Sequence, residues 1–163
     1  MESRVFASTA AVVSCGSLLH FAWEWSGQNW FVGLFAAINE SVWEHLKLAF
    51  WPALMLSPVH RVLYGPCPGC WPAVTLRCVL PALLIPILYY GYTGLMGHHW
   101  LPADLAVFTA SVFAGEWIGH ALLRRHWSKA VRVASATILL LVTGAFSTLT
   151  YLPPDLFLFD EPV

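Results

Sequence analysis

The sequence has few charged residues, and this shortage decides its class. Asp, Glu, Lys and Arg make up 10% of its 163 residues, whereas an average soluble domain has about 25%. A soluble globular domain is therefore excluded as the default interpretation. The net charge of −1 also gives no electrostatic support for a nucleic-acid partner.

The sequence also lacks the short motifs that accompany several common activities. It contains no P-loop, no GxSxG nucleophile elbow, no HExxH zinc motif and no dinucleotide-binding fingerprint. ATP-driven transport by this chain alone is therefore not expected.

Apolar residues, in contrast, are abundant. They make up 58% of the chain, which excludes a disordered protein and predicts an integral membrane protein. A helix that crosses the hydrocarbon core needs about 20 mostly apolar residues. The sequence predicts an all-α bundle of five transmembrane helices in a single domain, residues 1–163, with spans at about residues 5–23, 40–57, 73–96, 101–123 and 131–152.

The basic residues predict how this bundle is oriented. Five spans place seven of the eight Lys and Arg residues on the side of the N-terminus. Because cytoplasmic loops are enriched in Lys and Arg, we expect a cytoplasmic N-terminus, an external C-terminus and a location in the cell (inner) membrane. The seven residues are Arg4, Arg61, Arg77, Arg124, Arg125, Lys129 and Arg132.

The second span allows two interpretations. Ser41 and Glu44 have capping-box spacing, and Asn39 is also a good N-cap, which predicts a helix from about residue 39 to 57. The segment Gln28–Ile38 would then lie on the outer surface or fold in as a re-entrant piece. Alternatively, one long tilted helix begins at Trp30.

Two strings in this region are distinctive. Residues His20–Gly27 read HFAWEWSG, and residues Asn39–Lys47 read NESVWEHLK. With the tyrosine-rich run at 89–94 and the acidic tail at 153–162, they resemble the signature of a family of small, uncharacterised, multi-pass prokaryotic membrane proteins, a domain of unknown function with an Asn-Glu-Ser-x-Trp-Glu-His motif. The resemblance implies a multi-pass membrane fold and no activity.

The same strings contain a candidate site near the outer membrane surface. His20 and Glu24, and likewise Glu40 and Glu44, are four residues apart, a spacing that places each pair on one helix face. His45 lies on a neighbouring stripe of the second helix. Mixed imidazole and carboxylate groups suit zinc, iron or manganese. One hypothesis is a metal held by His20, Glu24, Glu44 and His45, with Glu40 as general base toward metal-bound water.

The alternative is that these groups are structural. Asn39, Glu40 and Ser41 would then begin a helix, and Glu44 and Lys47 would form a surface ion pair. The chain would be a structural or accessory subunit in the lipid bilayer, with a membrane-protein partner or a second copy of itself. A metal-dependent enzyme at the outer leaflet and a cation or proton transporter are the other two hypotheses, so enzymatic activity stays open.

Further polar residues lie elsewhere. Glu116 and His120 form a second pair four residues apart, about 20 Å deeper than the start of their helix at 1.5 Å per residue. We expect an intrahelical hydrogen bond there, a link to Ser111 or a tyrosine, or a separate step in a proton path. Cys67 and Cys70 form a lone CxxC motif for which redox, zinc-binding and turn interpretations stay open.

Overall fold

The computed structural model describes residues 2–64 and 69–161, and these residues form helices and loops with no strand. The prediction of an all-α fold is therefore confirmed. Six helices follow one another in the described part of the chain: α1 (Glu2–Trp25), α2 (Trp30–Gly33), α3 (Val42–Tyr64), α4 (Cys70–Met96), α5 (Leu101–Leu122) and α6 (Lys129–Leu149).

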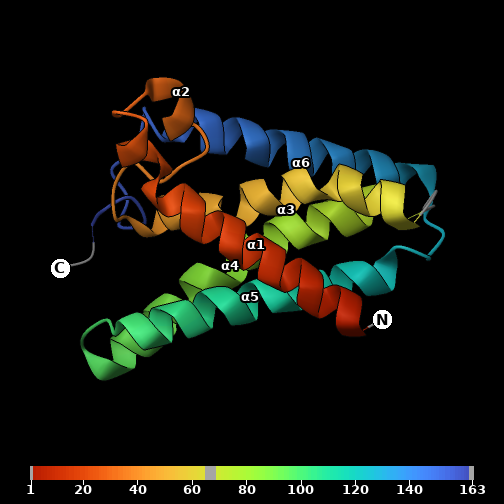
Figure 1. The fold of residues 1–163 in the computed structure, drawn as a ribbon, viewed down its shortest axis with the longest axis horizontal. Coiled ribbons are helices and arrows are strands. Elements are labelled where there is room, and N and C mark those ends of the chain that lie inside the picture. The colour runs from red at the N-terminus through yellow and green to blue at the C-terminus, as the bar shows by residue number, and fades with distance from the viewer. Residues whose placement is uncertain (1, 65–68, 162–163) are drawn as a thin grey trace.

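The five long helices run alternately in opposite directions along one axis (Figure 1). The N-terminus lies at one end of the bundle, which we call the N-terminal end. The C-terminus, the short helix α2 and the turn between α4 and α5 lie at the other, which we call the C-terminal end. Helix α4 contacts α3, α5 and α6 and is therefore central.

Four helices, α1, α4, α5 and α6, are long and apolar enough to cross a membrane. Large apolar side chains such as Leu83, Ile87, Leu140 and Leu141 are exposed on the outside of the bundle. Such a surface is unfavourable in water and suits a lipid environment. The chain is a multi-pass membrane protein.

The start of α3 decides between the two interpretations of the second span. The Ser41 hydroxyl accepts the Glu44 amide at 3.4 Å, and the Asn39 side chain accepts the Ser41 amide at 3.0 Å. These caps precede α3, which begins at Val42, within three residues of the predicted start. The alternative of one helix from Trp30 is wrong, because α2 and a connecting loop precede Ser41. The far end of the helix was misplaced, since α3 continues to Tyr64.

Close packing of α4 against α5 depends on two glycines. A Cβ atom on Gly115 would lie 2.8 Å from the Pro81 ring, and one on Gly119 would overlap the Arg77 side chain. Helix α4 therefore approaches α5 at positions where α5 has no side chain. This approach brings Arg77 into the bundle interior, where it is 1% exposed.

Candidate metal centre and buried polar networks

The structure brings together three of the predicted site residues, His20, Glu40 and His45. The Glu40 carboxylate lies 3.6 Å from His20 Nε2 and 3.5 Å from His45 Nε2. One ligand atom from each residue lies within 4.8 Å of the other two. His20 comes from the last turns of α1, His45 from the first turn of α3, and Glu40 from the loop just before α3. We call these three residues the His/Glu triad.

The spacing of the His/Glu triad fits a small divalent metal. Ligand atoms about 2.0–2.1 Å from a tetrahedral zinc ion are about 3.3–3.4 Å from one another. The two carboxylate–imidazole distances, 3.5 and 3.6 Å, are close to that edge length. Two imidazoles and one carboxylate leave a fourth tetrahedral position open, as catalytic zinc sites require.

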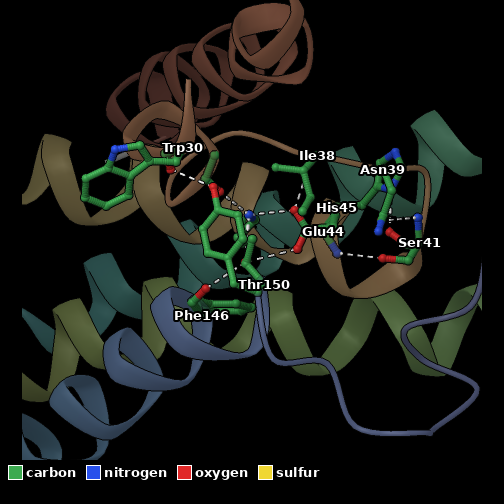
Figure 2. Close-up of polar contacts among 11 residues, drawn as sticks. Trp30, Ile38, Asn39, Ser41, Glu44, His45, Phe146 and Thr150 are labelled. Carbon is green, nitrogen blue, oxygen red and sulfur yellow. Dashed lines mark hydrogen bonds and ion pairs between the residues drawn. The ribbon is translucent and has the colours of Figure 1, made fainter. Parts of the chain in front are cut away.

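A hydrogen bond orients the His45 ring for this role. Its Nδ1 lies 2.9 Å from the Ser41 carbonyl oxygen, an acceptor, so in the neutral ring Nδ1 carries the proton and Nε2 has the lone pair. That lone pair points toward Glu40. A carbonyl that holds the far nitrogen of a ligating histidine is a typical support of metal sites. Figure 2 shows His45 beside Ser41 and Asn39 at the start of α3.

The His/Glu triad lines a cavity of about 470 Å³ between α1, α3, α4 and α5. Its walls are mainly apolar and include Gly16, Leu48, Leu105 and Phe108. The His side chains are 29% and 31% exposed and the Glu40 side chain 64%, so a solute can reach them. The cavity therefore combines an accessible polar cluster with room for an apolar group.

A second polar group lines the same cavity from α5 and the turn before it. His99 Nδ1 lies 3.3 Å from the Asp104 carboxylate, which also accepts the Tyr92 hydroxyl. In the neutral tautomer that donates from Nδ1 to this carboxylate, Nε2 of His99 has the lone pair. Neither His98 nor His99 belongs to the His/Glu triad.

Glu44, predicted as a metal ligand, lies instead in a buried ion pair. Its carboxylate is 2.6 Å from Lys47 Nζ, with side-chain exposures of 2% and 0%. The prediction of a surface pair between these residues is wrong in its burial. Glu24, the fourth predicted ligand, is exposed near the end of α1 and is not part of the triad.

This ion pair fastens three segments together, and we call it the Glu44–Lys47 lock. Lys47 donates to the Gly33 carbonyl at 2.8 Å and to the Thr150 hydroxyl at 3.0 Å. Glu44 accepts the Ile38 amide at 3.0 Å and lies 3.1 Å from the Thr150 hydroxyl. The lock therefore ties the loop around α2 and the end of α6 to the first turns of α3 (Figure 2).

Tyr151, next to the lock, holds the same loop. Its hydroxyl donates to the Trp30 carbonyl at 2.6 Å. Partial burial, together with the negative charge of Glu44, raises the pKa of the Tyr151 phenol. The phenol therefore stays protonated and keeps donating well above neutral pH.

The second predicted pair, Glu116 and His120, belongs to a buried network in the half of the bundle toward the N-terminal end. Glu116 is 2.6 Å from Arg77 Nη2 and accepts the Ser8 hydroxyl at 2.5 Å. His120 Nδ1 lies 3.0 Å from the Glu116 carbonyl oxygen, which matches the expected intrahelical hydrogen bond. Among the described residues, the carboxylate is bound by Arg77 and Ser8 and not by Ser111 or a tyrosine.

Sequence reasoning missed Arg77, because it counted this residue among the cytoplasmic basic residues. The signal was present, since Arg77 lies inside an apolar helix of 27 residues. An ionised group at that depth needs a partner of opposite charge within the bundle. Glu116 was the one acidic residue at a comparable position of another predicted span.

No cysteine of the described residues belongs to the His/Glu triad. Cys67 lies outside the described residues, so the CxxC interpretations stay predictions. Cys15 and Cys78 are free thiols, the first exposed and the second buried.

Comparisons with known proteins identify the family without assigning an activity. No curated protein and no solved structure matches the chain. A family model described as a family of unknown function, DUF6512, matches residues 1–163 and confirms the resemblance to an uncharacterised membrane-protein family. The chain belongs to this family.

Proposed function

We propose that the chain crosses the membrane five times, with α3 as the fifth span. Helix α3 has 23 residues and runs antiparallel to its neighbours (Figure 1). Its two charges near the start, Glu44 and Lys47, neutralise each other, which reduces the cost of placing them at membrane depth. The N-terminus would be cytoplasmic and the C-terminus external, because Arg4, Arg125 and Arg132 lie at the N-terminal end.

Cysteine labelling tests this topology in intact cells. In a variant whose own cysteines are replaced by serine, Asp155→Cys should react with an external, membrane-impermeant maleimide. Arg125→Cys should react only after the membrane is permeabilised. Labelling of both sites from outside, or of neither, would refute five crossings with this orientation.

We infer that the His/Glu triad is a divalent-metal site of a membrane hydrolase. The convergence of His20, Glu40 and His45 at the mouth of a mainly apolar cavity carries this proposal. Glu40 takes the place of a ligand here, since its carboxylate lies between the two imidazoles. A divalent metal, when bound, supplies a Lewis acid that activates water toward an ester or phosphoester.

The other wall of the cavity supplies the base that such a reaction needs. His99, oriented by Asp104, would accept the proton from water at Nε2. The hydroxyl group of water then joins the acyl or phosphoryl group, and the proton passes to the departing alcohol. The apolar walls favour a substrate with a hydrocarbon chain that enters from the outer leaflet.

Metal analysis of the detergent-purified protein tests the site directly. The protein should bind about one Zn²⁺, Fe²⁺ or Mn²⁺ per chain, and His45→Ala or Glu40→Gln should lower the affinity for it at least tenfold. Glu24→Gln is the matched control, because Glu24 is an exposed carboxylate outside the triad. Equal metal content in all four proteins would refute a triad site.

A structural or accessory subunit is the second candidate. The Glu44–Lys47 lock supports it, since its groups are fully buried and serve only to join segments. A stable membrane-protein partner in a mild-detergent pull-down, together with a metal-free triad, would favour this role. A metal-loaded monomer would exclude it.

A further inference from the structure

We propose that the molecule bound in the cavity is an amphiphile with a positively charged ammonium headgroup. This inference rests on the proposed function, because it names the substrate class of the same site. It depends on a second cavity beside the first, on the aromatic and acidic side chains that line it, and on the charge of this end of the bundle.

The second cavity has a volume of about 360 Å³ and lies between the end of α4 and the C-terminal tail. Its lining includes Tyr89, Tyr90, Phe157, Asp160 and Glu161. We call it the headgroup pocket. The two cavities share lining residues, namely Val42, Tyr89 and His99, so they adjoin each other.

The tail that forms one side of the headgroup pocket is held in a defined position. The Tyr90 hydroxyl donates to the Phe157 carbonyl at 3.2 Å, and the Trp43 amide donates to the Leu158 carbonyl at 3.0 Å. The Phe159 ring stacks on Trp43 with centroids 4.7 Å apart. The carboxylates of the next two residues are therefore placed at the pocket by packed neighbours.

Three aromatic rings form a corner in this pocket. The Tyr89 and Tyr90 rings are 5.2 Å apart at 80°, and the Tyr90 and Phe157 rings are 5.2 Å apart at 74°. Rings set nearly perpendicular to one another present both faces and edges to a small group. Aromatic faces attract ammonium ions through their quadrupole, and rings of this kind recognise choline-like groups.

The charge of this end of the bundle selects the same ligand. Asp160 and Glu161 are exposed carboxylates at the headgroup pocket. Among the described residues, Lys47 is the one Lys or Arg at this end of the bundle, and Glu44 neutralises its charge in the buried lock. The local field is therefore negative, attracts a cation and repels an anionic headgroup.

The two adjoining cavities can accommodate the headgroup, the ester and the hydrocarbon chain of one amphiphile. An ammonium group would lie between the aromatic corner and the tail carboxylates, and the ester or phosphoester next to it would lie at the His/Glu triad. The hydrocarbon chain would follow the apolar walls formed by Leu48, Leu105 and Phe108. A zwitterionic phospholipid of the outer leaflet has these three parts in this sequence.

Calorimetric titration with two short-chain lipids tests this inference. Dihexanoyl-phosphatidylcholine and dihexanoyl-phosphatidylglycerol share their chains and phosphate and differ in the ammonium group. The metal-loaded protein in maltoside detergent should bind the choline lipid about tenfold more tightly, the combined size expected of an ion pair and a cation–π contact. The double variant D160N/E161Q should lose this preference.

The control is Asp155→Asn, which removes a tail carboxylate that does not line either cavity and should leave the preference unchanged. Equal affinity of the unmodified protein for both lipids, or a preference that survives in D160N/E161Q, would overturn the inference. Metal content, measured on the same samples, separates this failure from that of the proposed function. A metal-loaded triad without headgroup preference refutes the ammonium ligand alone.

Discussion

Replacement of Lys47 by methionine should destabilise the protein severely. The Lys47 side chain is 0% exposed and its ammonium group lies 2.6 Å from Glu44. Methionine keeps much of the hydrocarbon stem and removes the charge, so the Glu44 carboxylate stays buried without its counter-ion. Breaking a buried pair in this way costs about 3–5 kcal/mol. The hydrogen bonds from Ile38 and Thr150 remain and place the expected loss toward the lower value.

The double variant Lys47→Met/Glu44→Leu should regain most of this loss. Removal of both charges eliminates the uncompensated carboxylate, and apolar replacement of a buried ion pair is often neutral or stabilising by about 1–4 kcal/mol. The contacts of the lock with Gly33, Ile38 and Thr150 are lost in the double variant and will limit the recovery.

Unfolding in a titration from mild detergent into sodium dodecyl sulfate, followed by the fluorescence of the nine tryptophans, measures both variants. The coupling free energy between the two positions should exceed about 2 kcal/mol, the range found for residues of one buried network. Additive losses, or a single variant as stable as the unmodified protein, would refute the account of the lock.

Three further substitutions test the packing and the second network, each by the same unfolding titration. Glu116→Gln leaves the buried Arg77 without its counter-ion and should lower the free energy of unfolding by about 3 kcal/mol or more. A loss below about 1 kcal/mol, a third of that value, would contradict the pairing. Gly119→Ala should cost about 1–3 kcal/mol because its Cβ overlaps Arg77, whereas Gly144→Ala, with open space around it, should be neutral. Asn39→Ala should cost about 0.5–2 kcal/mol through loss of its cap on the Ser41 amide, and no change would show that water replaces it.

Hydropathy predicted the all-α class, and the four strongest spans were within three residues of α1, α4, α5 and α6 at each end. These segments are long and apolar, so their composition alone is enough to identify them as helices. The end of α3 was placed too early, at about residue 57 where the apolar run finishes, whereas the helix continues through Pro58 to Tyr64.

Two of the four predicted metal ligands, His20 and His45, belong to the His/Glu triad, whereas Glu24 and Glu44 do not. The short connection between the first two spans brings His20 and His45 together, as expected from the sequence. Glu40 and Glu44 were placed on one helix face by their spacing, but Glu40 precedes the Ser41 cap and has no helical position. Helical periodicity therefore does not apply to it, and it faces the imidazoles while Glu44 faces Lys47.

The Leu158 carbonyl, which accepts the Trp43 amide, has a consequence for biogenesis. The first amides of a helix have no partner within that helix, and here one of them is satisfied by a residue that is synthesised long after it. The first turn of α3 therefore cannot complete its hydrogen bonds until α6 and the C-terminal tail have left the ribosome. Nascent chains that end after α4 should therefore insert into the bilayer without forming the final arrangement of the site at the start of α3.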